Sequence, residues 1–93
     1  MKTKKHPLLS TYVGTNREIV SFHYGGEGQG EKVYIQASLH ADELPGMLVA
    51  YHLRRRFAEL ETAGKIRGEI VVVPVANPVG LAQTLLHSQV GRF

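Results

Sequence analysis

Cysteine is absent from these 93 residues, and so is tryptophan. Without cysteine the chain can form no disulfide bond and no zinc or redox site built on thiolates. No apolar run reaches the roughly 20 residues of a membrane-spanning helix, and the "PLL" after the N-terminal lysines is too short for a signal peptide. We therefore expect a cytoplasmic protein with no membrane partner.

A strong charge of one sign is also lacking, because the net charge is only +3. The basic residues gather in "KTKKH" near the N-terminus and in the run Arg54, Arg55 and Arg56. A nucleic-acid surface would need more basic residues with aromatic residues between them. We interpret the arginine run as a solvated helix face and expect no nucleic-acid partner, while the oligomeric state stays open.

The composition, 43% hydrophobic and 20% charged, is typical of one small globular domain. Residues 1–16 are expected to be a loosely ordered lead-in, followed by a strand over 18–24. The glycine-rich segment 25–30 is interpreted as a hairpin loop, and a second strand is expected over 32–39. Because a strand and not a helix follows these glycines, a phosphate-binding loop is not favoured.

A helix is expected over residues 44–63. Asp42 is a candidate N-cap, Pro45 would lie in the first turn, and Gly64 is a candidate C-terminal stop. Apolar residues recur every three to four positions, which predicts one buried stripe. The stripe would consist of Met47, Ala50, Leu53 or Arg54, Phe57 and Leu60.

The apolar run over 70–75 predicts a strand that is buried on both faces. A strand, a helix and a buried strand in succession indicate a parallel pair joined by a right-handed crossover. One helix cannot cover both faces of such a sheet. Residues 1–93 are therefore expected to be the N-terminal part of a single larger α/β domain.

The stretch "QASLHADELPG", residues 36–46, places His40 and Glu43 three residues apart where a strand ends and a helix begins. Ligands bind at this edge of open α/β sheets. Imidazole and carboxylate groups are both good zinc ligands. The alternative is a surface histidine, with a glutamate that interacts favourably with the helix dipole.

Three motifs in order, "ASLHADELPG", "VVPVANPVGLAQ" and "GRF", resemble the succinylglutamate desuccinylase/aspartoacylase family within the zinc carboxypeptidase group. The resemblance covers residues 32–93, and Ala41 stands where many members have glycine. It implies a mixed, largely parallel sheet flanked by helices, of which this chain is an N-terminal portion. It also implies a zinc-dependent hydrolase that cleaves an amide bond of a small N-acyl amino acid or N-acyl amine.

The resemblance implies roles for individual residues. His40 and Glu43 would be the first two ligands of a single zinc ion, and Arg92 would polarise the scissile carbonyl and bind the substrate. Asp42 and Asn77 are weaker candidates for substrate contact, because an N-cap and a turn residue explain them as well. His23, on a strand, and His52, inside the helix, have no ligand-like partner in the sequence, and His87 is expected to be a structural or exposed loop histidine.

The resemblance also implies functional groups that cannot be matched here: a third zinc ligand, a general base and an Asn-Arg pair for the substrate carboxylate. We therefore expect the 93 residues alone to be inactive. The alternatives are a metallopeptidase that acts on short peptides and a truncated, non-catalytic fragment with a binding role only.

Overall fold

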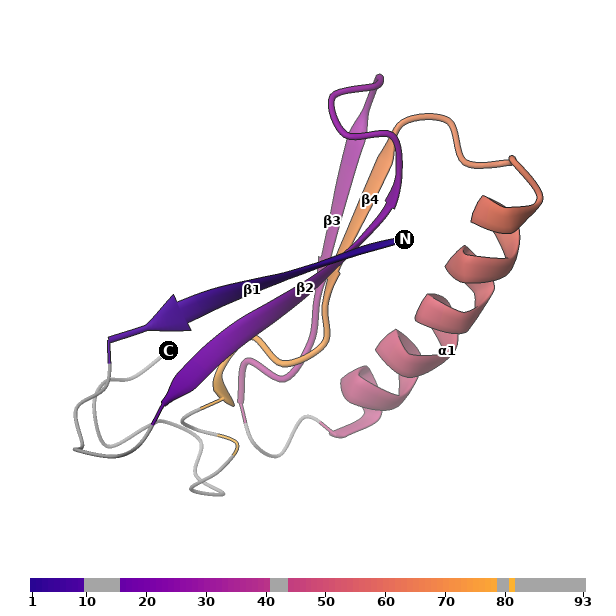
Figure 1. Ribbon diagram of the computed structural model, residues 1–93. Helices are drawn as coiled ribbons and strands as arrows, with labels where there is room; N and C mark the ends of the chain where they lie inside the picture. Colours follow the sequence, from indigo (N-terminus) through magenta and orange to yellow (C-terminus); the bar gives the residue numbers. More distant parts are fainter. Residues whose placement is uncertain (10–15, 41–43, 79–80, 82–93) are drawn as a thin grey trace.

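A computed structural model describes residues 1–9, 16–40, 44–78 and 81 of the chain (Figure 1). It contains a four-stranded sheet with one long helix packed against it. In chain order the elements are β1 (Lys2–Leu8), β2 (Arg17–Gly25), β3 (Lys32–Gln36), α1 (Leu44–Thr62) and β4 (Glu69–Val73).

The strands are arranged in the order β1-β2-β4-β3. β3 and β4 are parallel, as the sequence predicts, whereas β2 is antiparallel to both β1 and β4. β4 lies inside the sheet, and its residues Val71, Val72 and Val73 are all at most 4% exposed. This burial agrees with its continuous apolar run, because side chains on both faces of the strand are almost inaccessible to water. The mixed α/β fold class is confirmed, although two of the three strand pairings in the described part of the chain are antiparallel, where the resemblance implies a largely parallel sheet.

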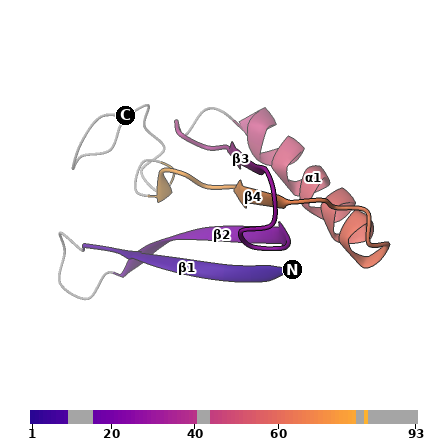
Figure 2. The ribbon, with the colours of Figure 1, turned by 90° about the horizontal axis from the view of Figure 1, so that it is seen from above.

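α1 packs on one face of the sheet, across β2 and β4 (Figure 2). The expected stripe faces the sheet: Ala50 is buried and its companions are half-buried. The core forms where Ala50 meets Tyr24 and Val72, and the rings of Tyr24 and Phe57 lie 5.7 Å apart. Tight packing of this small apolar group is the main force that holds α1 on the sheet.

The helix ends where the sequence predicts. Gly64 has a φ of 69°, a left-handed conformation that glycine adopts without a steric cost. The amide of Gly64 donates to the carbonyl of Glu61 and the amide of Lys65 donates to that of Leu60. These two bonds form a Schellman motif, which satisfies carbonyls that the last turn would otherwise leave unpaired.

The lead-in expected over residues 1–16 is wrong for residues 2–8, which form β1. This strand pairs with β2 over its whole length, from Lys2 opposite His23 to Leu8 opposite Arg17. Its side chains are mostly exposed and polar, so it lacks the apolar alternation by which strands are predicted. Backbone hydrogen bonds hold it in place, because every residue can accept such a bond and every residue but proline can also donate one.

The hairpin expected over residues 25–30 is also wrong, because β4 lies between β2 and β3. The segment crosses from one strand to the other past the start of β4, where Gly26 donates to the carbonyl of Gly68 and Glu69 donates to that of Glu31. Positive φ angles at Gly28 and Gly30 agree with the expected use of glycine in this turn.

The face of the sheet opposite α1 carries no helix within the described part of the chain (Figure 2). His6, Ser21, His23 and Tyr34 are among the residues that line a hollow on this face, of about 280 Å³. No helix among the described residues combines the length and the apolar character needed to cross a membrane.

Candidate functional site

The carboxyl ends of β3 and β4 meet at one edge of the sheet, because the two strands are parallel. Beyond the strands the two segments stay together. The amide of Ala37 donates to Val73 at 2.9 Å, and the amide of Ala76 donates to Ala37 at 2.9 Å. His40 follows three residues later, at the edge where α/β sheets bind their ligands.

Asn77 joins the two segments through both its backbone and its side chain. Its amide N–H donates to the carbonyl of Ser38 at 3.1 Å, and its side-chain Nδ2 donates to the carbonyl of Leu39 at 3.1 Å. The residue is only 3% exposed. Its own carbonyl accepts from the amide of Leu81, which agrees with the turn expected at this position. Substrate contact by Asn77 stays a prediction.

Ser38 is held in a conformation that non-glycine residues seldom adopt. Its φ is 59°, and β3 ends at Gln36 instead of continuing to residue 39 as expected. Such a conformation costs on the order of 1–3 kcal/mol and persists only where the surroundings enforce it. The hydroxyl is buried, and no group in the described part of the chain forms a hydrogen bond with it. No pattern in the sequence indicates this conformation of Ser38.

His40 is half-buried at the end of this clamped segment. Its imidazole is a suitable zinc ligand, and the rigid backbone before it suits a metal site, which needs fixed donors. Glu43, Asp42, Arg92 and His87 lie outside the described residues, so their roles stay predictions. Across the described ranges, no three His, Cys, Asp or Glu side chains are grouped so that they could hold a metal ion.

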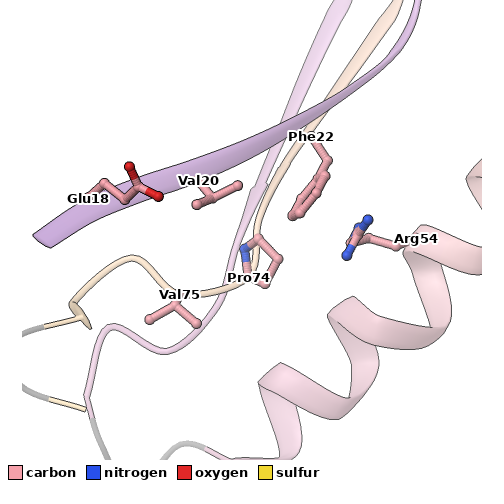
Figure 3. A pocket seen from close by; sticks show the side chains of 6 residues that line it. All are labelled: Glu18, Val20, Phe22, Arg54, Pro74 and Val75. Atoms are coloured by element: carbon pink, nitrogen blue, oxygen red, sulfur yellow. The ribbon is translucent and has the colours of Figure 1, made fainter. Parts of the chain in front are cut away.

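A pocket of about 290 Å³ lies between α1 and the sheet, next to this edge (Figure 3). It is lined by Glu18, Val20, Phe22, Arg54, Pro74 and Val75. Arg54 extends from α1 over the ring of Phe22, 3.3 Å from its centroid, and its Nε donates to the hydroxyl of Tyr24 at 3.2 Å. Arg54 is therefore part of the packed stripe, whereas Arg55 and Arg56 are exposed as expected.

A polar cluster on the opposite face was not anticipated from the sequence. The Oγ of Ser21 lies 2.8 Å from the Nε2 of His6 and 2.8 Å from the Nε2 of His23. The Nδ1 of His23 lies 3.5 Å from a carboxylate oxygen of Glu69, which also pairs with Lys32 at 3.7 Å. The expectation that His23 has no ligand-like partner is wrong, because the carboxylate of Glu69 lies beside its ring. Only the strand register brings these residues together, so no local pattern could have revealed them.

The comparisons with known proteins agree with the motifs at this edge. A family model described as the succinylglutamate desuccinylase/aspartoacylase catalytic domain matches residues 29–86, which include β3, α1 and β4. The chain belongs to this family. Desuccinylases and aspartoacylases are hydrolases that remove acyl groups. The chain therefore belongs to a hydrolase or deacylase family.

A solved structure of a succinylglutamate desuccinylase/aspartoacylase family protein from Shewanella amazonensis SB2B resembles the whole chain, with a TM-score of 0.76 and 30% identity. The match covers 100% of this chain and 24% of that one. The chain thus spans about a quarter of the length of this relative. A comparison with curated proteins finds no match.

Proposed function

We propose that this chain supplies the first zinc-binding segment of a zinc-dependent amidohydrolase. The observation that carries the proposal is the place of His40. It lies at the carboxyl edge of a parallel strand pair, directly after a segment clamped by Asn77, in a chain of the desuccinylase/aspartoacylase family. The substrate we propose is a small N-acyl amino acid or N-acyl amine, whose amide bond is cleaved.

In this proposal His40 and Glu43 hold one zinc ion. A zinc ion at such a site polarises a carbonyl and lowers the pKa of a bound water to about 7. Arg92 carries a guanidinium that would stabilise the negative charge developing on the carbonyl oxygen. Asp42 would cap α1 or line the substrate site.

The remaining groups of such a site would have to come from outside these 93 residues: the third zinc ligand, the general base and the pair that binds the substrate carboxylate. Two protein ligands hold zinc weakly, and a water is poorly activated without a base. We therefore propose that the chain alone binds zinc weakly and does not turn over substrate. A cytoplasmic location is part of the same proposal.

Zinc titration of the chain, followed through the histidine side-chain resonances in NMR spectra, tests the metal assignment. His40→Ala should abolish the zinc-dependent shifts, because removing one ligand opens the site. His52→Ala is the matched control, because His52 is an exposed histidine on α1 and should leave binding unchanged. Equal zinc affinity of the His40→Ala chain and the unsubstituted chain would refute the assignment.

The substrate class is tested on a longer protein that contains this chain. Hydrolysis of N-succinyl and N-acetyl amino acids should be zinc-dependent and should exceed the hydrolysis of unblocked dipeptides. The opposite preference would favour the metallopeptidase alternative. No hydrolysis of either class by a zinc-loaded protein would favour a binding role.

A further inference from the structure

We propose that Asn77 is a positioning residue for His40, an inference that rests on the metal site proposed above. This role differs from the substrate contact predicted for Asn77 from the sequence, because it acts on the backbone of this chain and the residue is only 3% exposed. Asn77 fixes the backbone directly before His40 through its hydrogen bond to the carbonyl of Leu39, which lies 38 positions earlier in the sequence.

The geometry supports this role in three steps. The parallel β3–β4 pairing continues beyond the strands through Ala37 and Ala76, which sets the two segments side by side. The backbone N–H of Asn77 then binds Ser38, and its side chain binds Leu39, the residue directly before His40. The last carbonyl before the proposed ligand is thus held by a side chain that is itself buried.

The conformation of Ser38 explains why such a clamp is needed. With a φ of 59°, Ser38 turns the chain away from the direction of β3 just before His40. A residue in this conformation returns to an ordinary one unless its neighbours prevent it. The two bonds from Asn77 flank this turn, one to Ser38 and one to Leu39, and therefore oppose its relaxation.

Metal ligands must be held within about half an ångström of their productive positions. Groups that orient a ligand without touching the metal typically change metal affinity by about 10- to 100-fold when they are replaced. We therefore expect loss of the Asn77 side-chain bond to weaken zinc binding at His40 by about tenfold or more.

The decisive variant is Asn77→Asp, because aspartate has nearly the same size and shape. At neutral pH its carboxylate cannot donate a hydrogen bond to the carbonyl of Leu39. Ser21→Ala is the matched control. Ser21 is as buried as Asn77 and forms side-chain hydrogen bonds, but it lies on the sheet face opposite α1 and bonds His6 and His23.

Two measurements on the 93-residue chain test the inference. The first compares the backbone and His40 side-chain resonances of the metal-free variants by NMR. Asn77→Asp should shift the signals of Leu39 and His40, and Ser21→Ala should not. The second compares zinc affinities, which should fall in Asn77→Asp and stay unchanged in Ser21→Ala.

The outcomes separate this inference from the proposed function. If the unsubstituted chain binds no zinc at His40, the metal site fails, while the metal-free resonances still decide whether Asn77 positions His40. If zinc binds and Asn77→Asp changes neither the resonances nor the affinity, the positioning role is refuted.

If Asn77→Asp does not fold, the unsubstituted chain gives the answer. Zinc should shift the side-chain amide signals of Asn77 together with those of His40, because the carbonyl of Leu39 connects them. A shift of the His40 signals alone would refute the role.

Discussion

Ser38 combines two unfavourable features in a single residue. It has a left-handed backbone conformation, and its hydroxyl is buried with no hydrogen-bond partner within the described ranges. A buried hydroxyl without a partner costs about 1–3 kcal/mol. Such costs are tolerated where function requires a particular geometry, and Ser38 lies two residues before the proposed zinc ligand His40.

Replacing Ser38 should therefore stabilise the fold. Ser38→Gly removes both the buried hydroxyl and the steric cost of the positive φ. Part of the gained stability is offset, because glycine gives the unfolded chain more conformational entropy. We expect a net increase of about 1 kcal/mol in the free energy of unfolding, or roughly 4–8 °C in Tm for a domain of this size. Thermal melting monitored by circular dichroism measures it.

Ser38→Ala is the control for this prediction. It removes the hydroxyl but keeps the Cβ atom, so it should gain less stability than Ser38→Gly. A Ser38→Gly chain that melts below the unsubstituted chain would show that the hydroxyl contributes an interaction instead of a penalty.

At the scale of elements, two glycines decide how closely the crossover passes β4. A Cβ atom on Gly25 would lie 2.2 Å from the carbonyl oxygen of Gly68, and one on Gly68 would lie 2.5 Å from that of Glu31. Both distances are far too short for contact with a backbone atom. The close approach permits the bonds from Gly26 to Gly68 and from Glu69 to Glu31, which fix the start of β4.

Alanine at Gly68 should consequently be costly. The φ of Gly68 is 98°, so Gly68→Ala adds backbone strain to the steric clash with Glu31. We expect a loss on the order of 3 kcal/mol in the free energy of unfolding, measured by urea denaturation. Gly28→Ala is the matched control, because Gly28 also has a positive φ but a Cβ atom there would meet nothing within 4 Å.

The control should cost only about 1 kcal/mol, the steric penalty of a left-handed conformation. Similar losses in both variants would mean that the close approach between Gly68 and Glu31 relaxes easily.

At the scale of the whole molecule, Glu61 connects three separate parts of the chain. From the last turns of α1 its carboxylate pairs with the N-terminal amine of Met1 and accepts a hydrogen bond from the amide of Gly25 at 2.7 Å. The bond from the N-terminal amine, followed by that from Gly25, holds the pKa of the Glu61 carboxyl below its usual value of 4.5. Glu61 thus ties the helix to β1 and to the end of β2.

This lowered pKa predicts how stability depends on pH. A carboxyl whose pKa is lower in the folded state stabilises the fold above its unfolded pKa, and this contribution disappears as the pH falls through the folded pKa. The unsubstituted chain should therefore be more stable than Glu61→Gln at pH 6, and the difference should shrink steadily below about pH 4.5. Urea denaturation across this pH range measures it.

Glu59→Gln is the control for this prediction. Glu59 lies on the same helix, is exposed and pairs only with Arg56 at 3.1 Å among the described residues. Surface pairs of this kind contribute little to stability, so its replacement should leave the pH profile nearly unchanged. A Glu61→Gln profile parallel to that of the unsubstituted chain would contradict the role given to Glu61.

Sequence patterns within single segments predicted several elements of the fold. The apolar run over 70–75 predicted a buried strand, which the structure has at Glu69–Val73. The stripe around Ala50 predicted the inward face of α1, and Gly64 predicted its end. The place of His40 between a strand and a helix followed from the same patterns. These predictions were possible because the burial of an element and the conformation at its ends require particular residue types at regular, local spacings in the sequence.

Apart from the parallel pairing of β3 with β4, which the sequence predicted, only the tertiary structure decided which segments meet. It placed β4 between β2 and β3, recruited residues 2–8 as β1 and brought Asn77 against Leu39. Strand pairing uses backbone groups that nearly every residue has, so the sequence of one segment does not specify its partner. The hydrogen bond from Asn77 to Leu39 depends on the pairing of β3 with β4. For this physical reason, the contact that positions the backbone before His40 could be found only in the folded chain.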